Sequence, residues 1–281
     1  MITTPSHSTS NGCTLKKIDI AIKEMIDEAY ERDSEDQERL YIGASGIGNA
    51  CPAAIAFGFR GFPETPPKPR TKRIFRDGRR IEWDVIKDLK KAKVNVLEVD
   101  PLTGKQWEHR TCGHIIGHAD GLIEGAKGSL SLLEIKSMND ARWKKCIKEG
   151  VKFSDRHYYD QVQLMMGMAS LEDCHFLFYN KNTSDYGHEV IPFSEFDYEA
   201  LLAKAEAIMR GDVQRVAETE DDWRCRGCFR FDACWCDELP KRKTMRSCAN
   251  SVAEHDGSWS CTNGCITECK DWEPWRPKNR S

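Results

Sequence analysis

Charged side chains interrupt the apolar stretch between His114 and Met138, and their types are suited to metal-assisted hydrolysis. Asp120 lies on one predicted strand, and Glu134 and Lys136 lie two residues apart on the next, so both point to one face of a sheet. Two carboxylates that meet beside a lysine form a hard, oxygen-rich site of the kind that binds Mg²⁺ or Mn²⁺. The lysine would then lie near the attacking water or the scissile phosphate.

An isolated E-x-K pair in a strand is more often a surface salt bridge, and this alternative stays open for the pair alone. The spacing D-x13-E-x-K in an apolar hairpin, however, resembles the core of the PD-(D/E)XK nucleases. A His-Ala pair precedes the aspartate, so the proline of that motif is absent. The resemblance implies that Asp120, Glu134 and the carbonyl of Ile135 bind Mg²⁺ or Mn²⁺, and that Lys136 orients or deprotonates the attacking water.

The resemblance extends to helices before and after the hairpin. Glu82, on a predicted helix over 77–91, matches the first acidic position of the superfamily and would bind the metal directly or through water; an exposed helix glutamate is the alternative. Tyr158 and Gln161, on a predicted helix over 157–170, resemble the Y-x-x-Q helix of RecB-like nucleases. That likeness gives Gln161 a positioning role, whereas glutamines that face solvent would have none.

Clustered cysteines near the C-terminal end indicate a second kind of metal site. Cys225-x2-Cys228-x5-Cys234 is a strong local signal, because a C-x-x-C turn aims two thiolates at one ion. The fourth ligand is either Cys236, which zinc would accept, or the distant Cys51, which precedes a proline at a predicted helix start. An iron–sulfur cluster would accept either one.

One C-P cysteine before the nuclease core and C-x2-C-x5-C after it resembles the iron–sulfur RecB-like nucleases. These include the CRISPR-associated exonuclease branch and the AddB-type helicase-nuclease subunit, and the resemblance points to a phage or mobile-element origin. It implies that Cys51, Cys225, Cys228 and Cys234 hold a structural four-iron four-sulfur cluster. Such a cluster would clamp the two ends of the nuclease fold together.

Residues 239–281 contain few aliphatic side chains, so they need a metal or another partner to fold. Four thiols would give a tetrahedral Zn²⁺ site, with His255 as a reserve ligand. These are Cys248, Cys261, Cys265 and Cys269. Three tryptophans would pack over this site or stack on bases. They are Trp259, Trp272 and Trp275.

The net charge of −3 excludes a nonspecific polycation, but two basic runs flank the site over 68–80 and 142–152. A charge run is often only a solvated surface. On both sides of a phosphodiesterase-like site, these runs instead favour contacts with DNA phosphates. The candidate DNA-binding residues are Arg73, Arg76, Arg79, Arg80, Lys144, Lys145 and Tyr158.

Length and composition bound the organisation of the chain. Its 281 residues suit one substantial domain and a small appendage, predicted as 1–40, 41–238 and 239–281. No apolar run is long enough for a membrane span or a signal peptide, so the expected location is the cytoplasm, that of the host if the protein is phage-encoded. No membrane partner is expected.

The periodicity of apolar residues predicts both helices and strands, and so an α/β (α+β) fold. The resemblance implies a restriction-endonuclease-like core with a mixed central sheet flanked by helices, plus a Cys-rich tail stapled by metal. Helices are predicted over 15–31, 77–91, 157–170 and 196–216. Strands are predicted over 94–100, 106–111, 115–123, 130–135, 175–180 and 189–192.

The resemblance implies a metal-dependent DNA exonuclease that acts on single strands or duplex ends and leaves 5′-phosphate and 3′-hydroxyl ends. Recombination, replication and DNA degradation are the processes such an activity would serve. A recombination or single-strand-binding protein is a candidate partner besides DNA. Two alternatives stay open: a nuclease-dead DNA-binding scaffold, and an endonuclease of the same superfamily.

Overall fold

The computed structural model divides the chain into two compact units. One comprises residues 1–37 and 66–77, and the other comprises 38–65 and 78–281. The residues that the structure describes are 12–32, 39–125, 128–265 and 269–278. None of the helices described is long and apolar enough to cross a membrane.

The first unit contains helix α1 (Gly12–Arg32) and the first turns of helix α4 (Pro69–Lys91). Arg73 Nη1 donates to Asp27 Oδ1 at 2.6 Å. Arg76 donates to the Tyr30 hydroxyl at 2.9 Å and pairs with Asp77 at 2.8 Å. Two of the arginines predicted to bind DNA therefore have partners within this unit. Helix α4 also begins earlier than predicted, so the basic run lies on its first turns.

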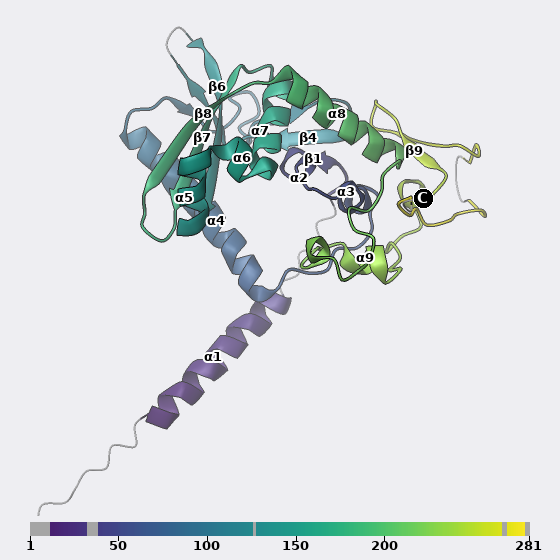
Figure 1. Cartoon of the computed structure of the whole chain (residues 1–281), viewed down its shortest axis with the longest axis horizontal. Coiled ribbons are helices and arrows are strands. Elements are labelled where there is room, and N and C mark those ends of the chain that lie inside the picture. Colours follow the sequence, from purple (N-terminus) through teal and green to yellow (C-terminus); the bar gives the residue numbers. More distant parts are fainter. Residues whose placement is uncertain (1–11, 33–38, 126–127, 266–268, 279–281) are drawn as a thin grey trace, which may run out of the picture. The chain divides into compact units, whose positions relative to one another are not determined.

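A five-stranded sheet forms the centre of the second unit (Figure 1). Its only parallel pair is β6 with β7, and its other pairs are antiparallel, so the sheet is mixed. In order across the sheet, its strands are β2 (Val96–Leu97), β5 (Gly121–Glu124), β6 (Leu130–Met138), β7 (Asp173–Asn180) and β8 (Tyr186–Pro192).

Helices pack on both faces of this sheet (Figure 1). On one face, Val162 of helix α7 (Arg156–Ala169) joins a buried cluster with Leu132. On the other, Val85 of α4 packs with Leu133. Alternate residues of β6 thus point to opposite helices, as the pleat of a strand requires. The predicted mixed sheet flanked by helices is confirmed, and a Cys-rich C-terminal segment is present.

The predicted strand over 115–123 is divided at Ala119 and Asp120. Its first half, β4 (Ile115–His118), pairs with β1 (Ile42–Gly43) and β3 (Glu108–Arg110) in a separate sheet, and its second half is β5. The predicted hairpin over 94–111 is divided in the same way, because β2 and β3 belong to different sheets. The break leaves Asp120 outside both strands, and this position is important for the site described below.

Shorter helices connect these sheets and complete the second unit. The predicted helix over 196–216 ends early, at Arg210, because Gly211 adopts a left-handed conformation with φ of 73° that caps it. The remaining helices are α2 (Ala44–Ile47), α3 (Pro52–Phe59), α5 (Asp140–Glu149), α6 (Val151–Ser154), α8 (Glu195–Arg210), α9 (Phe231–Trp235), η2 (Trp223–Cys225) and η3 (Met245–Ser247).

The C-terminal segment carries a hairpin of β9 (Ser251–Ala253) and β10 (Trp259–Cys261), and it packs around the buried side chain of Arg60. The Arg60 guanidinium donates to the carbonyl oxygens of Cys248 at 3.0 Å and Ser251 at 3.1 Å. It also lies 5.3 Å from the ring centroid of Trp259 and 5.1 Å from that of Trp275. These two tryptophans therefore pack inside the fold, and contacts cross the predicted boundary at 238.

Candidate active site

Strand β6 places Glu134 and Lys136 on the sheet face that α7 covers. The Lys136 ammonium donates to Glu134 Oε1, and Gln161 of α7 donates to the same oxygen from Nε2 at 2.7 Å. Glu134 is only 1% exposed, and its second oxygen, Oε2, has no hydrogen-bond partner among the described residues. A buried carboxylate oxygen without a partner is costly, so this atom is a ready ligand for a cation.

Asp120 joins this group from the break between β4 and β5. Its Oδ2 accepts the backbone N–H of Ile135 at 2.8 Å, which fixes the carboxylate between two strands. In a continuous strand, the backbone on both sides of Asp120 would form hydrogen bonds within a single sheet. The break instead brings the side chain of Asp120 to the charged end of β6, beside Glu134 and Lys136.

The three carboxylates of the site all have raised pKa values, with burial as the largest cause. Burial and the neighbouring Asp120 raise the pKa of Glu134 to about 8. Burial and Asp120 also raise the pKa of Glu82, on α4, to about 7, which shows that Glu82 faces this group. Burial also raises the pKa of Asp120. A divalent cation would remove this repulsion, since it neutralises the charges that the site brings together.

Lys136 is the cation that the site itself supplies. Burial alone would lower its pKa, but the carboxylates of Glu134 and Asp120 raise it above its ordinary value. Lys136 therefore stays protonated in the metal-free site. A protonated lysine can stabilise negative charge, but it cannot accept a proton.

Tyr158 and Arg142 border the site on its outer side. The Tyr158 ring centroid lies 5.3 Å from Lys136 Nζ and 5.2 Å from the guanidinium carbon of Arg142. Arg142 forms an ion pair with Asp155, whose side chain caps α7. Arg142 was not among the predicted site residues. The sequence feature that could have identified Arg142 is its position in the first turn of the helix that follows the E-x-K strand.

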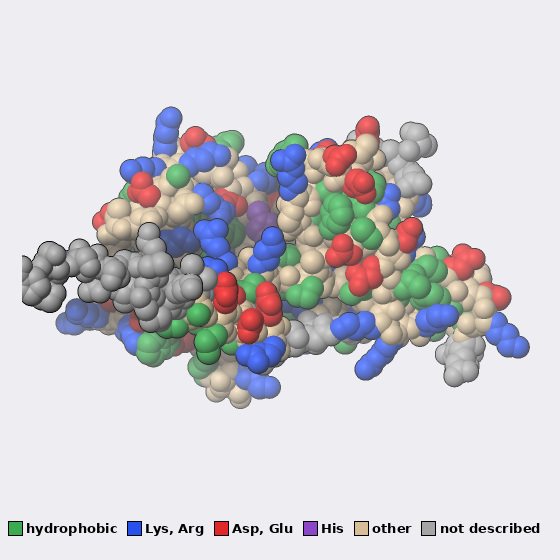
Figure 2. All heavy atoms as spheres, turned by 90° about the horizontal axis from the view of Figure 1, so that it is seen from below, with side chains coloured by type: hydrophobic (Ala, Val, Ile, Leu, Met, Phe, Trp, Pro, Cys, Tyr) green, Lys and Arg blue, Asp and Glu red, His purple; other side chains and the backbone are tan. Residues whose placement is uncertain are grey.

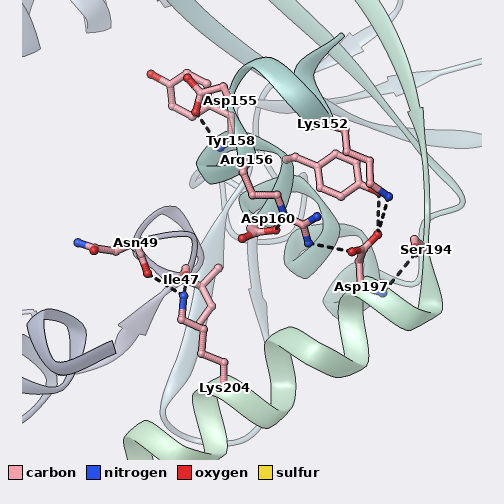
Figure 3. A network of polar contacts seen from close by, with 11 residues as sticks. Ile47, Asn49, Lys152, Asp155, Arg156, Tyr158, Asp160, Ser194, Asp197 and Lys204 are labelled. Carbon is pink, nitrogen blue, oxygen red and sulfur yellow. Dashed lines mark hydrogen bonds and ion pairs between the residues drawn. The ribbon is translucent and has the colours of Figure 1, made fainter. Parts of the chain in front are cut away.

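A polar network holds the first turns of α7 against α8 (Figure 3). Arg156 pairs with Asp160 at 2.6 Å and with Asp197 at 2.8 Å. Lys152 and the Tyr159 hydroxyl also contact Asp197, at 3.1 and 3.0 Å. Because Tyr158 and Gln161 lie on these same turns, the network fixes the helix that presents both of them to β6.

Four other predicted DNA-binding residues are exposed on α4 and α5. Lys144 and Lys145 are exposed on α5 and pair with Asp140 and Glu149 of the same helix. Arg79 lies near enough to Glu82 to lower its pKa against the larger effect of burial. Arg80 is exposed on α4. Figure 2 shows acidic side chains among the basic ones on the face that it draws, so the charge there is mixed.

The raised pKa values predict how metal affinity changes with pH. We expect Mn²⁺ to bind more tightly as pH rises from about 6 to about 9, because Glu82 and Glu134 must lose protons with pKa values of about 7 and about 8. Titration calorimetry in several buffers would count the protons released. An affinity that is constant over this range would contradict the prediction.

The same shifts predict the stability of the metal-free protein. Glu134 keeps its proton in the fold above its ordinary pKa of 4.5, whereas the unfolded chain loses it, so this group lowers the free energy of unfolding as pH rises from 4.5 to about 8. Glu134→Gln should remove that decline. Thermal melts with a chelator across this range measure it.

Four cysteines from distant parts of the chain line one pocket. Cys51 is the N-cap of α3, and it meets the three cysteines that surround α9. These are Cys225, Cys228 and Cys234. Cys236 is exposed and does not line the pocket, and neither a carboxylate nor a histidine does. The pocket therefore offers four thiols and no competing oxygen or nitrogen ligand.

The cysteines of the tail form a looser group. Cys265 Sγ lies 3.1 Å from Cys269 Sγ, and Cys261 interacts with Cys265. Cys248 is buried, and its thiol lies beside the Arg60 guanidinium. His255, the predicted reserve ligand, pairs instead with Glu206 at 2.9 Å. Over the described part of the chain, no three His, Cys, Asp or Glu side chains are arranged to hold a single ion.

No family model matches the chain, and no curated protein matches it in sequence. Solved structures resemble it at low identity. LHK-Exo in complex with dAMP is 19% identical with a TM-score of 0.46, covering 60% of this chain and 85% of that one. SSO0001 is 18% identical with a TM-score of 0.47, covering 78% and 98%. The alkaline exonuclease LHK-Exo from Laribacter hongkongensis is 20% identical with a TM-score of 0.42, covering 66% and 93%.

Proposed function

We propose that this protein is a metal-dependent DNA nuclease whose active site lies between β6 and α7. The observation that carries the proposal is the buried Glu134, whose free oxygen lies in a group of three carboxylates with Lys136 as their cation. An exposed salt bridge, the alternative for the E-x-K pair, does not describe a glutamate that is 1% exposed. Hard oxygen ligands of this kind suit Mg²⁺ or Mn²⁺.

Asp120, Glu134 and the carbonyl of Ile135 would hold the ion, and Glu82 would bind it directly or through water. The ion supplies a Lewis acid for the phosphate and lowers the pKa of a bound water. Gln161 holds Glu134 in place through Oε1, which leaves Oε2 for the metal. Lys136 orients the attacking water and stabilises the charge that develops on the phosphate.

An exonuclease is the preferred form of this activity, and its support is the resemblance to RecB-like nucleases in the D-x13-E-x-K spacing and the Tyr158 and Gln161 helix. Arg142 and Tyr158, beside Lys136, would contact the backbone and a base of the strand being cut. DNA is the proposed partner, and a recombination or single-strand-binding protein would deliver the ends. Cytoplasm is the proposed location.

The decisive experiment compares purified protein with Mn²⁺ or Mg²⁺ on linear DNA labelled at the 5′ end, linear DNA labelled at the 3′ end, and closed circular DNA. We expect both linear substrates to be degraded and the circle to remain. Cleavage of the circle would favour an endonuclease. Binding of all three substrates without metal-dependent cleavage would favour a DNA-binding scaffold and refute the proposal.

We further propose that the pocket of Cys51, Cys225, Cys228 and Cys234 holds a four-iron four-sulfur cluster. Each thiolate of such a cluster binds a different iron, so its ligands surround a group larger than one ion. Four thiols that line one pocket with neither a carboxylate nor a histidine beside them suit the all-cysteine ligation of such a cluster. The cluster would join the start of α3 to the segment around α9.

For the tail, we propose Zn²⁺ held by Cys261, Cys265 and Cys269. Cys248 is the proposed fourth ligand. Its backbone carbonyl accepts a hydrogen bond from Arg60 Nη1 at 3.0 Å, which fixes the main chain at this residue. Zinc content of the protein before and after Cys265→Ala tests this site.

A further inference from the structure

Three arginines line the cysteine pocket together with the four thiols: Arg215, Arg224 and Arg230. Two of them have carboxylate partners. Arg224 contacts Asp222 with two nitrogens, Nη2 to Oδ2 at 2.6 Å and Nε to Oδ1 at 2.9 Å. Arg230 Nη2 lies 3.0 Å from Glu64 Oε2. The positive charge of these two arginines is therefore largely offset outside the pocket.

Arg215 differs from both, because its charge is directed at a cysteine. Its Nε donates to Cys234 Sγ at 3.2 Å, and its Nη2 donates to the Cys234 carbonyl at 2.7 Å. The guanidinium carbon lies 4.4 Å from the centroid of the Trp235 ring, which shields it on that side. Within the described ranges, no carboxylate forms an ion pair with Arg215, and none lines the pocket.

The chemistry of the proposed cluster gives this contact a consequence. Four thiolates around an oxidised four-iron four-sulfur core carry a net charge of 2−, and one added electron makes it 3−. A cation and an N–H donor stabilise the more negative state more strongly, and net charge and hydrogen bonds to sulfur are among the factors that set cluster potentials. Partial burial of Arg215 and Cys234 strengthens both effects, because it reduces the screening of charge by water.

We propose that Arg215 raises the reduction potential of this cluster and so makes it a redox-active centre, in addition to a structural clamp. The inference rests on the proposed cluster. The electron comes from an external one-electron donor and stays on the cluster, and no covalent bond forms or breaks.

The test is a redox titration of the full-length, cluster-loaded protein with dithionite, followed by visible absorbance and electron paramagnetic resonance. For Arg215→Gln we expect a midpoint potential lower by about 59 mV, the shift of a tenfold change in a one-electron equilibrium. Arg215→Lys, which keeps the charge, should restore part of the shift. Arg224→Gln is the matched control, because Asp222 already offsets that charge, and it should shift the potential less.

Equal midpoint potentials in Arg215→Gln and the parent protein, at equal iron and sulfide content, would overturn the role of Arg215 and leave the cluster itself in place. A parent protein that contains zinc and no iron would overturn the cluster and the inference together. If Arg215→Gln fails to keep its cluster, the midpoint potentials of Arg215→Lys and Arg224→Gln can be compared instead. A larger shift of the midpoint potential in Arg224→Gln than in Arg215→Lys would contradict the proposal.

Discussion

Replacement of Lys136 by alanine is expected to slow the Mn²⁺-dependent degradation of linear DNA by about 10²- to 10³-fold, the loss that follows removal of one preorganised charge at a transition state. Lys136 is the cation in contact with Glu134, and no other described lysine or arginine forms an ion pair with that carboxylate. Without the Lys136 ammonium, the bound metal would be the remaining cation that stabilises the negative charge of the carboxylates. The rate of release of labelled nucleotides measures the effect.

Lys87→Ala is the matched control, because Lys87 is an exposed lysine on α4 that pairs with Asp84 and lies outside the predicted site. It should degrade DNA at nearly the parent rate. Lys136→Ala should still bind Mn²⁺, since Asp120 and Glu134 remain, and calorimetry can show this. Unchanged cleavage by a folded Lys136→Ala protein would sink the assignment of the active site.

The second large effect concerns the cysteine pocket. An iron–sulfur cluster would colour the protein brown. Cys225→Ala should lose this colour and most of the bound iron, because three thiolates hold a four-iron cluster poorly. The start of α3 and the segment around α9 would then lose the link between them, so the thermal midpoint should fall as well. Iron and sulfide analysis with a thermal melt gives both results in one preparation.

Cys236→Ala is the control for this experiment, since Cys236 is exposed and lies outside the pocket. It should keep the colour, the iron and the thermal midpoint. A colourless parent protein with stoichiometric zinc at this site would contradict the cluster. Loss of iron in Cys236→Ala as well as Cys225→Ala would instead show that the sequence-local set of cysteines binds the metal.

Local patterns were enough to predict several elements of this fold. The helix that bears Tyr158 and Gln161 spans Arg156–Ala169, close to the predicted 157–170, because its apolar residues recur at the helical period. The placement of Glu134 and Lys136 on one face of β6 follows from the alternation of a strand. The apolar period alone predicted too long a helix over 196–216, because Gly211 caps the helix and ends it at Arg210.

Other features depended on contacts between distant residues. The sequence could not show that the strand after Ile115 breaks at Asp120, since the break exists because one half pairs with β1 and β3 and the other with β6. It also could not show Arg60, whose buried guanidinium is satisfied by carbonyls far along the chain. Arg142 reached the site for the same reason, through Tyr158.

By itself, the sequence determined the chemical types: carboxylates on successive strands, a lysine beside one of them, and cysteines at metal-binding spacing. Tertiary structure alone decided which of these meet. It brought Glu82 near Asp120, placed Cys51 in one pocket with Cys225 and left Cys236 outside it. Among the described residues, it gave Arg215 no carboxylate partner. The physical reason is that spacing fixes neighbours only within one element, whereas burial and pairing across the sheet depend on the packing of the whole chain.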